Sequence, residues 1–165
     1  MQDELLARWM QEYGDSILRM CFLYLKDYHL AEDAAQETFL KAARSYGTFE
    51  HASSEKTWLT RIAINCCKNI MRTRWFRTPP VSLTEAASES VNPFDTLLQQ
   101  NSLASAIASL PRADRELILM YYYQDLSTKE IAEIIHKTVN TTAQRIHRAK
   151  VKLKKILQEV DYEEA

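Results

Sequence analysis

The chain has 165 residues, of which 46% are hydrophobic, enough for one ordinary domain or two small ones. Only two glycines and four prolines occur, and such a composition favours helices over sheets. The three cysteines, Cys21, Cys66 and Cys67, make neither a disulfide framework nor a metal-binding spacing, so we expect buried, reduced thiols. The first residues do not form a signal peptide, and no uncharged run could span a bilayer, so we expect a soluble, cytoplasmic protein.

The small net charge of −1 conceals an uneven distribution of charge along the chain. Residues 1–55 carry ten acidic and five basic residues, whereas residues 56–77 carry six basic and no acidic ones. Residues 137–155 carry seven basic and no acidic ones. Two separate basic windows indicate two contacts with one polyanion, such as nucleic acid. The alternative is that both windows are solvated helix faces.

Apolar residues at three- and four-residue steps predict a first amphipathic helix over residues 4–26. Its expected core positions are Leu5, Leu6, Trp9, Met10, Tyr13, Ile17, Met20, Cys21 and Tyr24. A second helix is predicted over residues 30–46, with a core stripe of Ala31, Ala35, Phe39, Ala42 and Tyr46. Its opposite face carries Glu32, Asp33, Gln36 and Glu37, and Glu37 can pair with Lys41 one turn later. That face is either solvated or a surface for contact with another protein.

A loop with a capping serine, Ser53 or Ser54, leads into a third predicted helix over residues 56–75. Its expected core stripe is Leu59, Ile62, Ala63, Cys66 and Ile70. The opposite side carries Arg61, Asn65, Lys68, Asn69 and Arg72, with Trp58 at the start of the helix and Trp75 and Phe76 at its end. Basic, amide and aromatic side chains together suit a single nucleic-acid strand, although Trp58 could instead be a core residue.

The segment of residues 78–94 marks a change in composition. Three of the four prolines fall within it, among many small polar residues and without any hydrophobic period. We therefore predict an all-α fold of two small helical domains, residues 1–77 and residues 95–165, joined by a flexible linker.

The second domain is predicted to begin with a helix from Phe94 to Leu110. Pro111 suits the start of the next helix, whose apolar positions are Leu117, Ile118, Met120 and Tyr121. Asp125 or Ser127 can cap a short helix that ends near residue 135, and a final helix is predicted over residues 139–160. The Tyr121–Tyr123 run has strand propensity but continues a helical period.

The end of the second domain has the pattern of a helix-turn-helix. Ile131 and Ile135 mark one buried face of the short helix, His136 stands where the turn needs a left-handed residue, and Thr138 can cap the final helix. The final helix is expected to bury Val139, Thr142, Ile146, Ala149, Leu153 and Ile156. Its other side carries Asn140, Thr141, Gln144, Arg145, Arg148, Lys152 and Lys155. Amides and hydroxyls suit base edges and the later cations suit phosphates, which predicts DNA binding, the alternative being a helical hairpin with a basic face.

No feature of the sequence indicates catalysis. The four histidines form no metal-ligand spacing, and neither a glycine-rich phosphate loop nor a nucleophile elbow occurs. We therefore predict a protein with no catalytic residues, metal, cofactor or small-molecule substrate.

Four segments in order resemble one known family. AEDAAQETFLKA, TWLTRIAINCCKN, LPRADRELILMYYYQDLSTKEIAEII and RIHRAKVKLKKIL are together similar to bacterial RNA polymerase sigma factors of the extracytoplasmic-function (ECF) group, in the sigma-70 family. The resemblance spans about residues 5–157 and implies a transcription initiation factor. Its first domain is expected to bind core RNA polymerase and the melted minus-ten element, and its second domain the minus-thirty-five element. The alternative is a stand-alone helix-turn-helix regulator, which leaves the first basic window unexplained.

The resemblance also implies roles for individual residues. Polymerase contacts fall on Asp33, Gln36 and Glu37, with Phe39 and Leu40 supporting their helix. Minus-ten DNA contacts fall on Lys56, Trp58, Arg61, Asn65, Lys68, Asn69 and Arg72. Minus-thirty-five contacts fall on Asn140, Thr141, Gln144, Arg145, Arg148 and Lys152.

Expected partners are core RNA polymerase, promoter DNA and an anti-sigma factor, which in this family is commonly membrane-anchored and would then hold the protein at the inner face of the membrane. The chain departs from the common family pattern at His136, Lys137, Asn140 and Ala143. These departures concern the promoter sequence and the details of docking rather than the class of function.

Overall fold

The computed structural model describes residues 2–49, 53–77 and 102–164, which form helices and no strand. The predicted all-α fold is therefore confirmed. The chain divides into two compact units, Met1–Asn92 and Pro93–Ala165. The predicted linker, residues 78–94, lies outside the described residues. None of the described helices is both long enough and apolar enough to cross a membrane.

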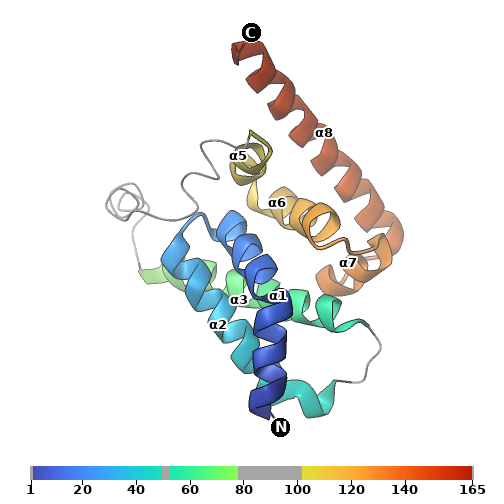
Figure 1. Ribbon diagram of the computed structural model, residues 1–165. Helices are drawn as coiled ribbons and strands as arrows, with labels where there is room; N and C mark the ends of the chain where they lie inside the picture. Colours follow the sequence, from blue (N-terminus) through green and yellow to red (C-terminus); the bar gives the residue numbers. More distant parts are fainter. Residues whose placement is uncertain (1, 50–52, 78–101, 165) are drawn as a thin grey trace. The chain divides into compact units, whose positions relative to one another are not determined.

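Unit 1 is built from three long helices: α1 (Gln2–Leu25), α2 (Tyr28–Ser45) and α3 (Glu55–Arg77). A short 3-10 helix, η1 (Tyr46–Thr48), follows α2. Figure 1 shows α1 beside α2, with α3 running across both of them. Their shared core includes Trp9, Ile17, Met20, Phe39 and Leu59, all nearly inaccessible to solvent.

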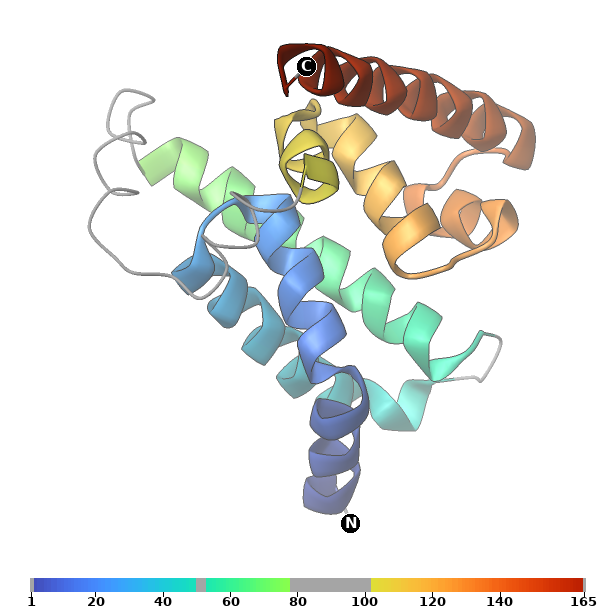
Figure 2. The same ribbon diagram turned by 45° about the horizontal axis from the view of Figure 1, so that its top comes forward.

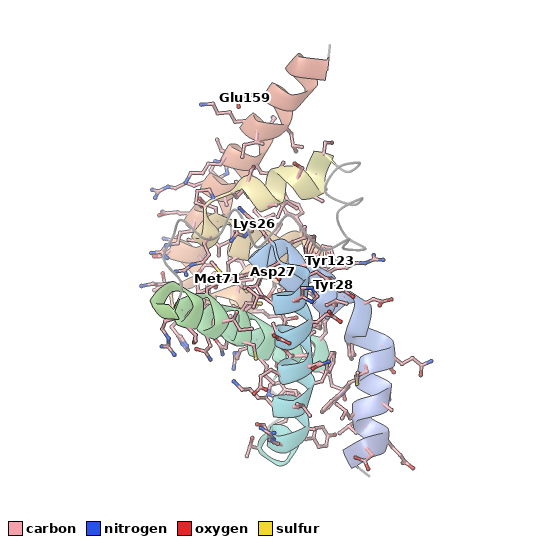
Figure 3. All side chains as sticks on the ribbon, turned by 90° about the vertical axis from the view of Figure 1, so that its left-hand side faces the viewer. Lys26, Asp27, Tyr28, Met71, Tyr123 and Glu159 are labelled. Carbon is pink, nitrogen blue, oxygen red and sulfur yellow. The ribbon has the colours of Figure 1, made fainter. Side chains whose placement is uncertain are left out.

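Lys26 and Asp27, both labelled in Figure 3, end α1 and begin α2. Lys26 has a left-handed backbone with φ 60°, and its N–H donates to the Phe22 carbonyl at 2.7 Å. Asp27 then caps α2, because its carboxylate accepts a hydrogen bond from the Leu30 N–H at 3.1 Å. This cap was not among the predicted ones, and it places the start of α2 two residues earlier than the sequence pattern indicated.

The predicted core of unit 1 is largely confirmed and wrong in places. Ala31, Ala35, Phe39 and Ala42 are buried on α2, but Met10 on α1 is 51% exposed. On α3, Leu59, Ala63 and Cys66 are buried, whereas Ile62 and Ile70 are only half-buried. The missed core positions of α2 and α3 are Ala34, Thr38, Thr57, Thr60, Ile64 and Cys67. A single-stripe reading of α2 misses residues because that helix packs against both α1 and α3.

All three cysteines are buried and free, as predicted. Burial raises the pKa of the Cys66 thiol, which keeps it protonated and unreactive at neutral pH. Among the residues that the structure describes, no group of His, Cys, Asp and Glu could hold a metal ion.

Unit 2 contains α5 (Ser102–Ser109), α6 (Arg112–Ile118), η3 (Leu119–Tyr123), α7 (Thr128–Ile135) and α8 (Val139–Glu164). Figure 2 shows α8 as the longest helix of this unit, with α5, α6 and α7 packed against it. The part of the predicted first helix before residue 102 lies outside the described residues. Pro111 is the N-cap of α6, as predicted, and the three-tyrosine run closes a π-helical turn.

Candidate nucleic-acid interfaces

The first helix of the helix-turn-helix, α7, begins at a complete capping box. The Ser127 hydroxyl accepts from the Glu130 N–H at 3.1 Å, and the Glu130 carboxylate accepts from the Ser127 N–H at 3.0 Å. Of the two predicted caps, Ser127 is therefore the one used. Asp125 instead adopts a left-handed backbone with φ 55° in the preceding turn.

The turn between α7 and α8 has the geometry that the sequence predicts. His136 lies in the left-handed region, with φ 58° and ψ 45°, and it ends α7. The next N–H, that of Lys137, donates to the Ala132 carbonyl at 3.1 Å. The Thr138 hydroxyl accepts from the Thr141 N–H at 3.1 Å and so caps α8. These bonds fix the direction in which α8 leaves the turn.

Helix α8 has one buried seam and a broad exposed face. Thr142, Ile146, Ala149 and Leu153 are buried, as predicted, and Ile156 is half-buried. The prediction for Val139 is wrong, because this side chain is 50% exposed. Val139 is the first residue of α8, and the buried seam begins one step later, at Thr142.

The predicted duplex-reading residues lie on the accessible sides of α8. Asn140, Gln144, Arg145, Arg148 and Lys152 are exposed, and Thr141 is half-buried. The Thr141 hydroxyl accepts a hydrogen bond from the Thr138 hydroxyl at 2.9 Å, which ties it to the cap. Side chains held above a buried seam are suited to the major groove, where amides bind base edges and cations bind phosphates.

Two further residues share the outward face of α8. His147 and Val151 are exposed and follow Asn140 and Gln144 at helical steps of three and four. The same spacing was visible in the sequence. A valine and a histidine are not recognisable as DNA-binding residues from spacing alone, because neither is an amide or a permanently charged cation.

Two lysines of the second basic window are held by neighbouring groups. The Lys152 ammonium lies 2.8 Å from the Asp114 carboxylate on α6. The Lys150 ammonium lies 4.1 Å from the ring centre of Tyr121 and 5.4 Å from that of Tyr122. Burial of Lys150 opposes its charged form, but its interactions with the two tyrosines outweigh burial and raise its pKa. Lys150 therefore keeps its charge but is held against two rings, whereas the charge of Lys152 is paired with a carboxylate.

The first basic window lies on α3. Of the predicted strand-binding residues, Asn65, Lys68, Asn69 and Arg72 are exposed, and Lys56, Trp58 and Arg61 are half-buried. The Arg72 guanidinium donates to the Asn69 amide oxygen at 3.3 Å, so these two polar groups form one local unit. The exposed row thus alternates amides with cations, which suits both bases and phosphates.

An aromatic cluster supports the start of α3. Trp58 stacks on Phe49 with ring centres 4.5 Å apart, and it meets Trp9 edge-to-face at 5.8 Å. Trp9 also meets Tyr46 edge-to-face at 5.5 Å. Trp58 is therefore neither fully core nor free, because it is half-buried and packed on one side by Phe49.

The amino-terminal end of α3 is anchored by a hydroxyl cap and an ion pair. The Ser54 hydroxyl accepts from the Thr57 N–H at 3.1 Å, which selects Ser54 of the two predicted caps. Arg8 of α1 donates to both carboxylate oxygens of Glu55, at 2.9 and 3.2 Å. This bidentate pair ties α1 to the first residue of α3, beside the aromatic cluster.

The acidic face of α2 is accessible. Asp33 and Gln36 are exposed and Glu37 is half-buried, and the predicted Glu37–Lys41 pair is present at 4.0 Å. Phe39 is buried and supports the helix, but Leu40 is 43% exposed, so its predicted supporting role is wrong. Leu40 follows Asp33, Gln36 and Glu37 at helical steps of seven, four and three, and so adds an apolar group to the same face.

Two family matches cover the two units. Residues 9–77 match Sigma-70 region 2, and residues 100–153 match Sigma-70, region 4. These matches define the class of the protein as a two-domain bacterial sigma factor.

Relatives and solved structures place the chain within that class. It is 32% identical to the ECF RNA polymerase sigma factor SigW of Bacillus subtilis over 161 residues, covering 90% of this chain and 86% of that protein. It is 32% identical to the RNA polymerase sigma-H factor of Pseudomonas aeruginosa over 160 residues, covering 89% and 83%. The fold resembles the sigma factor RpoE solved with the anti-sigma factor NepR from Bartonella quintana, with a TM-score of 0.69, 23% identity, and coverage of 92% and 97%. It also resembles CnrH solved with the cytosolic domain of CnrY, with a TM-score of 0.70, 21% identity, and coverage of 95% and 90%.

The chain belongs to the ECF sigma factors. It is accordingly a transcription initiation factor that directs RNA polymerase to promoters.

Proposed function

We propose that the two units divide promoter recognition between a paired and an unpaired form of DNA. In unit 2, α8 enters the major groove of the minus-thirty-five element. Asn140, Thr141 and Gln144 lie on its first turns, where a recognition helix meets base edges. Arg145 comes directly after Gln144 and Arg148 lies about one turn beyond it, and both cations are suited to phosphates. The observation that carries this assignment is the outward face of α8, held above a buried seam by the Thr138 cap.

In unit 1, α3 and the aromatic cluster take the unpaired strand of the minus-ten element. Lys68 and Arg72 are suited to phosphates, and Asn65 and Asn69 to base edges. Lys56, Trp58 and Arg61 lie nearer the start of the helix, where Trp58 has an aromatic face backed by Phe49. Trapping an unpaired strand in this way favours promoter melting by binding energy alone, so the protein performs no catalysis.

The acidic face of α2 docks on core RNA polymerase. Asp33, Gln36 and Glu37 supply charge and hydrogen-bond acceptors, and the partly exposed Leu40 supplies an apolar contact between them and the end of the helix. A polar rim around an apolar contact is the usual composition of a protein interface. A stand-alone regulator would use unit 2 only and would leave this face and α3 without a role.

The protein acts in the cytoplasm, and it is held in reserve by an anti-sigma factor until a stress signal releases it. Support comes from the two structural neighbours, which were solved with an anti-sigma factor and with the cytosolic domain of CnrY. An anti-sigma factor that is anchored in the membrane would keep the complex at the inner membrane face.

The polymerase assignment is tested by co-elution with purified bacterial core RNA polymerase on size exclusion. Asp33→Lys with Glu37→Lys reverses two charges on the α2 face, and we expect the double variant to elute apart from core polymerase. Glu4→Lys with Asp15→Lys makes the same charge change on exposed positions of α1 and should co-elute like the original protein. Circular dichroism should show unchanged helicity in both variants. Normal co-elution of the α2 variant would refute the docking face.

A further inference from the structure

The ion pair between Asp114 and Lys152 lies on one flank of the duplex-reading helix. Lys152 is on α8 and Asp114 is on α6, and their side chains meet at 2.8 Å across 38 residues of sequence. The Asp114 side chain is only 15% exposed, whereas that of Lys152 is 54% exposed. The carboxylate is thus the sheltered partner, and the ammonium is the solvent-facing one.

A sheltered carboxylate holds its cation more firmly than an exposed one does. Water screens the attraction between a sheltered carboxylate and its cation less. If the cation left, the carboxylate would stay partly buried without a partner, which costs free energy. A DNA phosphate that approached Lys152 would have to break this pair, or else accept the negative charge of Asp114 beside it. Either route reduces the binding free energy that a contact between Lys152 and the phosphate can contribute.

Exposed arginines of α8 differ from Lys152 in this respect. In the part of the chain that the structure describes, no carboxylate pairs with Arg145 or Arg148, and both side chains are exposed. Each such cation that neutralises a phosphate contributes about 0.9 to the slope of log affinity against log salt. A cation that is already neutralised within the protein contributes little to that slope.

We propose that Asp114 is a positioning residue that withholds Lys152 from the DNA backbone and so sets the edge of the duplex-binding face of α8. This inference rests on the proposed binding of duplex DNA by α8. Phosphate contacts then come from Arg145 and Arg148, while Lys152 ties α8 to α6. Because phosphate contacts are independent of sequence, withholding one cation lowers non-specific binding and raises the share of affinity that depends on base contacts.

The test measures the salt dependence of binding to a labelled duplex of arbitrary sequence, using the full chain between 50 and 200 mM salt. Asp114→Asn frees Lys152, so the slope should steepen by about 0.9, a change of roughly threefold in affinity across that range. Asp114→Asn combined with Lys152→Gln removes both charges and should leave the slope of the original protein unchanged. Arg148→Gln is the matched control and should make the slope shallower by about 0.9.

The neutral double variant decides the question even if Asp114→Asn alone does not fold. A double variant with a slope as shallow as that of Arg148→Gln would show that Lys152 contacts phosphate in the original protein and would overturn the proposal. An unchanged slope in Asp114→Asn, beside a shallower one in Arg148→Gln, would overturn it as well. If Arg148→Gln has no effect on the slope, or the chain binds no duplex, the proposed role of α8 fails and this inference fails with it.

Discussion

The two basic helices, α3 and α8, carry similar charge and are presented differently. Residues 56–77, which include nearly all of α3, contain no acidic side chain. Residues 137–155, which include most of α8, contain none either. Helix α8 follows a tightly capped turn and exposes one continuous face above a single buried seam. Helix α3 packs against both α1 and α2, exposes a narrow row around Lys68, and begins beside the stacked rings of Phe49 and Trp58.

Under the roles proposed above for α3 and α8, charge identifies a nucleic-acid ligand while packing distinguishes its form. A duplex groove requires a protruding helix with a fixed direction, since base edges are read at defined positions along it. An unpaired strand exposes the faces of its bases, and these are bound by aromatic rings as well as by cations. The aromatic cluster beside α3 has no counterpart on the outward face of α8 over residues 139–159, whose side chains are described and whose exposed members are polar, charged or aliphatic.

The largest expected effect is a loss of folding stability in unit 2 when a core side chain beneath α8 is removed and the core beneath α3 is left intact. Ile146→Ala removes a buried side chain under α8 and should destabilise unit 2 by about 2–5 kcal/mol. Because Trp9, Trp58 and Trp75 all lie in unit 1, tryptophan fluorescence reports the unfolding of unit 1 alone. In a urea titration, the midpoint of the fluorescence transition should stay fixed. The part of the circular dichroism transition that reports unit 2 should move to a lower urea concentration.

Ile17→Ala is the matched control, because it removes the same side chain from the core of unit 1. It should lower the fluorescence midpoint and leave the other part of the transition in place. If Ile146→Ala shifts the fluorescence midpoint equally, the two units unfold as one body and the separation drawn between the two helices is incorrect.

A smaller effect should distinguish base reading on α8 from strand binding on α3. Gln144→Ala should weaken binding of holoenzyme to duplexes selected from a random library by about 1–3 kcal/mol and relax one base position. Asn69→Ala should instead weaken binding to forked DNA with an unpaired minus-ten strand and leave the closed duplex unaffected. Fluorescence anisotropy on the two kinds of DNA measures both effects. Equal losses for Gln144→Ala on selected and unselected duplexes would refute its base-reading role.

Local chemistry could be predicted from the sequence with good accuracy. The left-handed His136, the Thr138 cap and the Ser127 cap each depend on residues within a few positions of one another, and all three are present. The helical period also gave most of the buried seam of α8. Such features are predictable because the interacting groups are neighbours along the chain, although the equally local Asp27 cap of α2 was not predicted.

Features that depend on distant segments could not be predicted. The periodic pattern assigned Met10 and Val139 to the core because it cannot show where the partner helices end, and both side chains are exposed. The Phe49–Trp58 stack and the Asp114–Lys152 pair join separate elements, and no spacing rule relates their partners. Resemblance implies a DNA contact for Lys152, but the sequence could not show that its ammonium lies 2.8 Å from the Asp114 carboxylate.

The smallest expected effect concerns the left-handed residues that end one helix in each unit. Lys26 follows α1 and His136 ends α7, with φ of 60° and 58°. A residue with a Cβ is strained there by roughly 1 kcal/mol, whereas glycine is not, although glycine makes the unfolded chain more flexible. We expect Lys26→Gly and His136→Gly each to stabilise its own unit by up to about 1 kcal/mol.

Lys26→Gly should raise the tryptophan fluorescence midpoint in urea, and His136→Gly should raise only the midpoint of the remaining circular dichroism transition. Destabilisation by His136→Gly would mean that the imidazole makes a favourable contact in the turn that outweighs the strain, and the turn would then depend on histidine rather than tolerate it.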